Sequence, residues 1–241
     1  VGFAIVGIGV DAVNWSKIGT IVLSWIVSPL VGGTIAFLLM RSIQKFILDT
    51  EIPFLNAKRY APFYVFLVGF LISLVTLFKG LKHLDIELSI LQSFILAVIF
   101  GVFVAVIAHI IINRISLKLG ESIHDQFNQI EKIFGIMMIF SASAMAFAHG
   151  SNDVANGIGP MAAIVSIVES GGEMAQKSSL PLWILLIGGF GIVLGLSTLG
   201  YRVIQTIGEK ITELVPTRGF SAELAAAATV VIASRTGIPV S

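Results

Sequence analysis

The sequence has no cysteine and little charge for its 241 residues. Without cysteine there can be no disulfide bonds and no thiolate metal sites. Charged residues make up 12% of the chain, about half the share of roughly 25% in soluble domains. The net charge is +1, and the 15 basic residues are scattered without forming a patch or stripe. This distribution argues against a nucleic-acid partner.

Apolar residues are abundant instead, and they make up 56% of the chain. An apolar run of about 20 residues is long enough to cross a bilayer as a helix. Runs of this kind predict membrane-spanning helices at residues 18–40, 61–78, 86–112 and 182–206, with a loop at 41–60. The expected fold class is therefore an all-α polytopic membrane protein.

Three regions are expected along the chain. Residues 1–112 carry the first spans, residues 113–132 form a polar connecting segment of mixed charge, and residues 133–241 hold the most unusual stretch. No targeting signal is visible at the start, and the chain ends at Ser241 directly after an apolar run. We interpret both ends as cuts inside a larger membrane domain.

The stretch at residues 146–161, AFAHGSNDVANGIGPM, places polar groups inside an apolar segment. Between Ile133 and Val168 the only ionisable side chains are His149 and Asp153. An ionisable group at membrane depth is costly, so it indicates a functional site. The flanking helix breakers predict a discontinuous or re-entrant helix here, and they are Gly150, Gly157, Gly159 and Pro160.

The spacing inside this stretch suggests an ion site. Asn152 and Asn156 are four residues apart and share a helix face, with Asp153 beside them. Amide and carboxylate oxygens suit sodium, and free N–H groups at a helix start suit an oxyanion. The alternative is that these residues only cap a helix break. His149 and Asp153 lack a third ligand nearby, which favours a structural histidine over a transition-metal site.

Three further positions carry weaker signals. Glu223 precedes an apolar run, so it is either a functional acid or a first-turn acid that stabilises a helix start. Ser241 would be a helix N-cap if the chain continued. Gly191 and Gly195 stand in a G-x-x-x-G register, which predicts close helix packing.

The motif resembles the second-repeat signature of the inorganic phosphate transporter (PiT) family, whose core is G-x-N-D-x-x-N. Two more segments, beginning DAVNWSKIG and GYRVIQTIG, are similar to family segments in the same order. The family is an inverted repeat in which each half supplies one Asn-Asp motif and one Pro-Val-Ser-Thr-Thr-His segment. By this resemblance the chain is the second half plus the tail of the first, and the first repeat is missing.

The resemblance implies a secondary transporter that is not an enzyme and has no cofactor. Its partners would be inorganic phosphate, sodium or protons as coupling ion, membrane lipid, the missing first repeat and, as an open alternative, a second copy in a homodimer. The implied substrate-binding residues are Gly150, Ser151, Asn152, Asp153, Asn156 and Ser241. The implied coupling-ion residues are Asn152, Asp153, Asn156 and Glu223. The expected location is the cell membrane, crossed several times.

Two other functions stay open from the sequence. Sulfate transport on the same fold differs in protonation, because phosphate near neutral pH carries an O–H donor and sulfate carries none. Asp153 is the expected acceptor for that proton, and an acceptor left unpaired by the wrong anion would give discrimination. An intramembrane aspartate enzyme or a structural membrane subunit is the alternative of another class. The enzyme would require a second acid near Asp153, and Glu223 is the candidate.

Overall fold

The computed structural model describes residues 5–6, 9–77, 89–115, 123–170, 181–211 and 215–236, and this part of the chain is helical without a strand. The expected all-α class is therefore confirmed. The α-helices are α2 (Trp15–Ile43), α3 (Pro53–Val75), α4 (Ile90–Asn113), α5 (Ile123–Glu169), α6 (Leu182–Gly195), α7 (Tyr201–Gln205) and α8 (Pro216–Thr236). A 3-10 turn, η1 (Val10–Ala12), precedes them, and the π-helical segments are η2 (Gln44–Leu48), η5 (Leu196–Gly200) and η6 (Thr206–Ile211).

Five helical stretches are long and apolar enough to cross a membrane: Trp15–Leu48, Pro53–Val75, Ile90–Asn113, Asp125–Ala146 and Leu182–Gly208. Four of them coincide with the spans predicted from sequence. The predicted loop at 41–60 is wrong, because α2 continues through η2 and α3 already begins at Pro53. Ile43, Ile47 and Phe54 are buried, so apolar packing extends both helices toward the connection. Pro53 at the first helical position suits a helix start.

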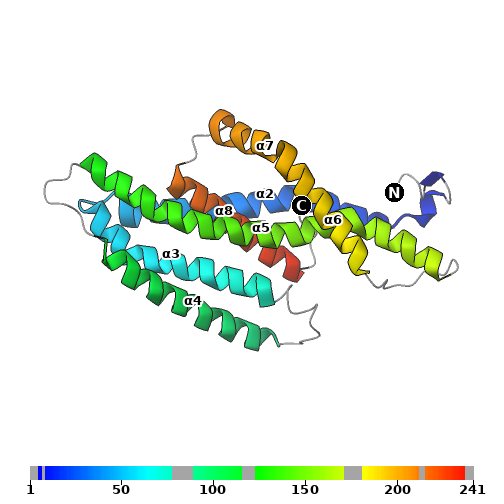
Figure 1. Cartoon of the computed structure of the whole chain (residues 1–241), viewed down its shortest axis with the longest axis horizontal. Helices are drawn as coiled ribbons and strands as arrows, with labels where there is room; N and C mark the ends of the chain where they lie inside the picture. Colours follow the sequence, from blue (N-terminus) through cyan, green and yellow to red (C-terminus); the bar gives the residue numbers. More distant parts are fainter. Residues whose placement is uncertain are drawn as a thin grey trace.

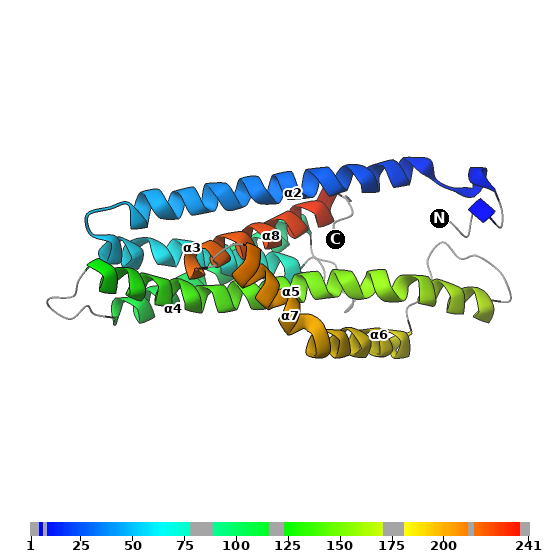
Figure 2. The same cartoon turned by 90° about the horizontal axis from the view of Figure 1, so that it is seen from above.

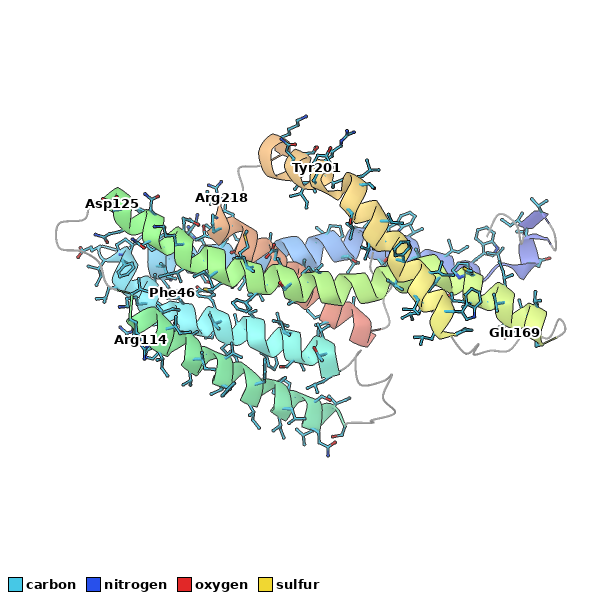
Figure 3. The ribbon with its side chains drawn as sticks, viewed as in Figure 1. Phe46, Arg114, Asp125, Glu169, Tyr201 and Arg218 are labelled. Atoms are coloured by element: carbon cyan, nitrogen blue, oxygen red, sulfur yellow. The ribbon has the colours of Figure 1, made fainter. Side chains whose placement is uncertain are left out.

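Helix α5 is the longest element, with 47 residues, and it organises the others (Figure 1). Helices α3 and α4 lie along its N-terminal half, and α6 crosses near its C-terminal half. Turning the molecule shows α8 lying between α2 and α5 (Figure 2). The labelled Asp125 and Glu169 mark the two ends of α5, and Phe46 and Arg114 lie toward the Asp125 end (Figure 3).

The best-packed part of the core is an aromatic cluster between α3, α5 and α8. Tyr64, Phe134 and Phe220 are each no more than 2% exposed. Their ring centroids lie 5.6 to 6.2 Å apart, and Phe220 meets both other rings edge to face. The Tyr64 hydroxyl is hydrogen-bonded to Ser42 Oγ of α2 at 2.8 Å. Edge-to-face contacts of this kind are favourable beyond the area they bury.

Close packing of α6 occurs at a different glycine from the predicted pair. A Cβ added at Gly191 or Gly195 would meet nothing within 4 Å among the described residues, so the G-x-x-x-G prediction is wrong there. A Cβ at Gly188 would instead overlap the Ile158 side chain of α5. The helices approach at Gly188 because it has no side chain and Ile158 fills that space.

Candidate functional site

The Asn-Asp motif lies within one continuous helix. Helix α5 runs unbroken from Ile123 to Glu169, so the predicted discontinuous or re-entrant helix is wrong. Glycine can adopt helical dihedrals, and proline within membrane helices is tolerated where neighbouring groups compensate. Packing of Ile158 and Ala162 on Ile184 of α6 keeps this part of the chain helical across Pro160. The motif interrupts the apolar character of α5 and not its helical backbone. It lies between the apolar stretches Asp125–Ala146 and Gly157–Glu169.

The structure places the backbone of the motif near the middle of α5. The motif residues within the helix are Gly150, Ser151, Asn152, Asp153 and Asn156. Gly150 is half-buried, and a Cβ added there would meet nothing within 4 Å among the described residues. The side chains of the other four, and that of His149, lie outside the described part. Ser241 lies outside the described residues altogether. The structure therefore fixes where the motif sits, while the roles of these side chains remain predictions.

Different helices pack on the two sides of the motif. Before it, Met145 packs against Val75 at the end of α3 and Val230 of α8. After it, Val154 and Val165 pack with Ile158, Ala162 and Ile184 where α5 meets α6. The motif thus lies at the point where α5 leaves the α3 and α8 contacts and joins α6.

Glu223 lies inside α8 and faces α5. Helix α8 begins at Pro216, so the interpretation of Glu223 as a first-turn acid is wrong. Its carboxylate oxygen Oε2 lies 2.6 Å from the Ser141 hydroxyl of α5. Another acid occupies the helix start instead, because Glu131 of α5 accepts bonds from the Thr217 backbone N–H at 3.0 Å and hydroxyl at 2.9 Å. A carboxylate suits this position because it satisfies a free N–H at the positive end of the helix dipole.

Glu223 and Asp153 do not share one site. Asp153 follows Ser141 by twelve residues on the same continuous helix, a separation of about 18 Å at 1.5 Å per residue. Glu223 is bonded to Ser141, so an aspartate side chain at position 153 cannot reach its carboxylate. The paired acids that an intramembrane aspartate enzyme needs are not brought together. Among the described residues there is also no group of three His, Asp or Glu side chains that could hold a metal ion.

Sequence reasoning missed the partners of both carboxylates. Ser141 lies in the run SASAM, which carries no motif, and Glu131 lies in the polar stretch that was interpreted as a connecting segment. The only available signal was Glu223 itself, since a lone acid in an alanine-rich helix requires a polar partner. Identifying that partner requires knowing that α5 and α8 are neighbours.

Comparisons with known proteins agree on one family. The family model described as the phosphate transporter family matches residues 1–241. A Haemophilus influenzae protein named "Putative phosphate permease" is 44% identical over 241 residues, which is 100% of this chain and 57% of that relative. The chloroplastic inorganic phosphate transporter 2-1 of Arabidopsis thaliana is 36% identical over 258 residues, with 100% of this chain and 44% of that relative covered.

A solved structure named "The sodium-dependent phosphate transporter" superposes with a TM-score of 0.84 and 34% sequence identity. The match covers 100% of this chain and 57% of that one. The chain therefore spans little more than half the length of the protein in that solved structure and of the Haemophilus influenzae relative. Together with five helices long and apolar enough to cross a membrane, these matches identify a multi-pass membrane protein of a transporter family. The chain belongs to the phosphate transporter family.

Proposed function

We propose that the full-length protein is a secondary transporter that moves inorganic phosphate together with sodium. The observation that carries this proposal is the position of the Asn-Asp motif, near the middle of α5 between two apolar stretches. An acid at membrane depth is retained where it meets an ion or a cavity. The family match and the sodium-dependent structural neighbour support phosphate and sodium as the two ions.

The continuous helix changes how the motif would bind its ions. Backbone N–H groups in a helix interior are used by the helix, so they are not free to bind an oxyanion. The donors to phosphate would therefore be the side chains of Ser151, Asn152 and Asn156, with Gly150 allowing close approach. Asp153 would accept the phosphate proton or balance the coupling cation. Glu223, on the neighbouring helix, lies too far along α5 to share an ion with Asp153, so it would be the acid of a separate cation position. Ser241 would be a further phosphate contact.

Pro160 leaves one further backbone oxygen available as a cation ligand. Proline has no N–H, so the backbone carbonyl of Asn156, four residues earlier in the helix, loses its regular donor. A carbonyl oxygen without a donor inside a membrane requires another partner. Carbonyl and amide oxygens are the hard ligands that sodium prefers. We include this carbonyl in the proposed cation site.

The substitution Asp153→Asn in the full-length protein tests the functional role of the motif. Asn caps a helix about as well as Asp, so a capping role predicts unchanged stability and unchanged uptake. A contact with phosphate or sodium predicts a loss of about 1.5 to 3 kcal/mol, or roughly tenfold to a hundredfold in affinity. Uptake of radiolabelled phosphate into proteoliposomes measures this, with thermal unfolding as the folding control. Normal uptake in the variant would leave the motif a structural feature.

The same liposomes separate the remaining alternatives. A sodium gradient at equal pH should drive uptake, whereas a pH gradient without sodium should not; the reverse would assign proton coupling. Sulfate at the concentration of phosphate should leave phosphate uptake nearly unchanged, because sulfate cannot donate a hydrogen bond to Asp153. Equal competition by sulfate would contradict that account of selectivity.

A further inference from the structure

The contact between Ser141 and Glu223 joins α5 to α8 through a buried hydroxyl. Ser141 is 1% exposed and Glu223 is half-buried. The distance from Ser141 Oγ to Glu223 Oε2 is 2.6 Å, and the distance from the same Oγ to the Met138 carbonyl oxygen is 3.0 Å. The shorter distance is in the range of a charge-assisted O–H···O⁻ bond.

The hydrogen-bonding capacity of a serine hydroxyl explains why it suits this position. A serine hydroxyl has one proton to donate and two lone pairs that accept. Ser141 can therefore donate a hydrogen bond to Glu223 Oε2 at 2.6 Å while its oxygen stays 3.0 Å from the Met138 carbonyl oxygen of its own helix. A side chain without a hydroxyl at this position would leave the Glu223 carboxyl group without its partner on α5.

Glu223 has no charged partner among the described residues. Within the described residues, Glu223 forms no ion pair, and Ser141 is its hydrogen-bond partner. The other acid on the facing side of α5, Glu131, is bonded to Thr217 near the start of α8. Phe220 and Leu224, near Glu223 along α8, belong to the buried apolar core cluster.

We propose that Ser141 is a positioning residue that holds the Glu223 side chain at the α5–α8 interface. Glu223 changes its electrostatic environment when a coupling cation binds or leaves, and Ser141 keeps its oxygen atoms in place through that change. This inference rests on the proposed function, because it assigns Ser141 to the cation dependence of the transporter. The substitution Ser141→Ala removes both the donor and the acceptor, whereas Ser141→Thr retains them.

The test compares Ser141→Ala with Ser221→Ala in the full-length protein. Ser221 is also buried in α8, but its hydroxyl donates to the Thr217 carbonyl of its own helix at 2.9 Å. Ser141→Ala should raise the sodium concentration for half-maximal uptake by about tenfold. The phosphate KM at saturating sodium should change less than twofold. Ser221→Ala should leave both values near wild type, and Ser141→Thr should restore the sodium dependence.

A second set of variants covers the case in which threonine does not fit the packed interface. Adding Ser141→Ala to Glu223→Gln should shift the sodium dependence no further than Glu223→Gln alone, because Ser141 acts through that side chain. Additive shifts would overturn the proposal, as would equal sodium dependence in Ser141→Ala and Ser221→Ala.

A measurement without phosphate separates this proposal from the transport function. Sodium that binds the folded protein raises its thermal unfolding temperature relative to choline. That sodium-induced rise should be smaller in Ser141→Ala than in Ser221→Ala, even if the protein carries another anion. A wild-type protein without phosphate uptake would overturn the proposed function alone. An unchanged sodium-induced rise in Ser141→Ala would overturn the positioning role alone.

Discussion

The two halves of α5 are packed very differently. Over residues 123–146 the helix faces α3 and α8, with Ile130, Phe134 and Met137 buried in the aromatic core. Over residues 154–169 it packs mainly on α6, through a small cluster around Ile158, Ala162 and Ile184. The Asn-Asp motif lies between these two parts of α5. One continuous helix thus joins a densely packed half to a lightly packed half, with the polar motif at the junction.

This contrast matters because lipid tails are as apolar as the core. Helix association in a membrane depends on van der Waals packing and interhelical hydrogen bonds, and much less on removing apolar surface from water. Substitutions in the first half should therefore affect stability, and substitutions at or beyond the motif should affect transport. The following experiments test that division, beginning with the largest expected effect on stability.

Phe134→Ala should destabilise the protein most. The phenyl ring packs against both Tyr64 and Phe220 and is fully buried. Removing a buried phenylalanine side chain costs about 3 to 5 kcal/mol, and the lower end fits an unfolded state that is also in lipid. Thermal unfolding of the full-length protein in detergent measures the loss. Phosphate KM in the folded fraction should remain near wild type.

Phe140→Ala is the matched control on the same helix. Phe140 is 62% exposed and lies outside the buried clusters of the described residues. Its removal should change stability by less than about 0.5 kcal/mol, as at other uninvolved surface positions. If Phe140→Ala destabilised the protein as much as Phe134→Ala, burial would not explain the stability of this half.

Gly188→Ala should have the next largest effect, in the second half. The new methyl group would overlap Ile158, so α5 and α6 must separate or Ile158 must change rotamer, at a cost of about 1 to 3 kcal/mol. Gly189→Ala is the control, because its methyl group would meet no described residue within 4 Å and alanine favours helix by up to about 1 kcal/mol. We expect Gly188→Ala to lower the phosphate uptake rate as well. Equal stability of the two variants would contradict the observed helix contact.

Pro160→Ala should separate stability from transport. Alanine restores an N–H donor to the Asn156 carbonyl and removes the clash of the proline ring with the preceding turn. The unfolding temperature should therefore rise or stay the same, while the sodium concentration for half-maximal uptake should increase about tenfold, or roughly 1.4 kcal/mol. A control is Pro29→Ala in α2, far along the chain from the motif. Unchanged sodium dependence in Pro160→Ala would remove this carbonyl from the proposed cation site.

The sequence predicts the positions of most membrane helices, but it does not predict which side chains of different helices bond to one another. Long apolar runs located α2, α3, α4 and α6 because crossing a bilayer dictates length and composition locally. The prediction of a helix break at the motif failed because glycine and proline weaken a helix without ending it when apolar neighbours pack beside them. The bonds of Glu131 and Glu223 connect residues more than 80 positions apart, and a local pattern carries no signal for such pairs. The roles of the motif side chains remain predictions.

Thr217→Val should have the smallest effect, and it tests whether the first half of α5 also fixes the start of α8. Thr217 is 1% exposed, and its hydroxyl donates to Glu131 Oε1 at 2.9 Å. Valine removes this bond and leaves the backbone N–H bond to Oε2 in place. We expect a loss of about 1 kcal/mol in unfolding free energy, typical of a helix N-terminal cap. The control Thr34→Val removes only an exposed bond to the Leu30 carbonyl of its own helix, and should change stability by less than about 0.5 kcal/mol. Equal losses in the two variants would mean that Glu131 does not anchor α8, whereas a loss confined to Thr217→Val, with normal sodium dependence, would place this acid in the scaffold and leave Glu223 to transport.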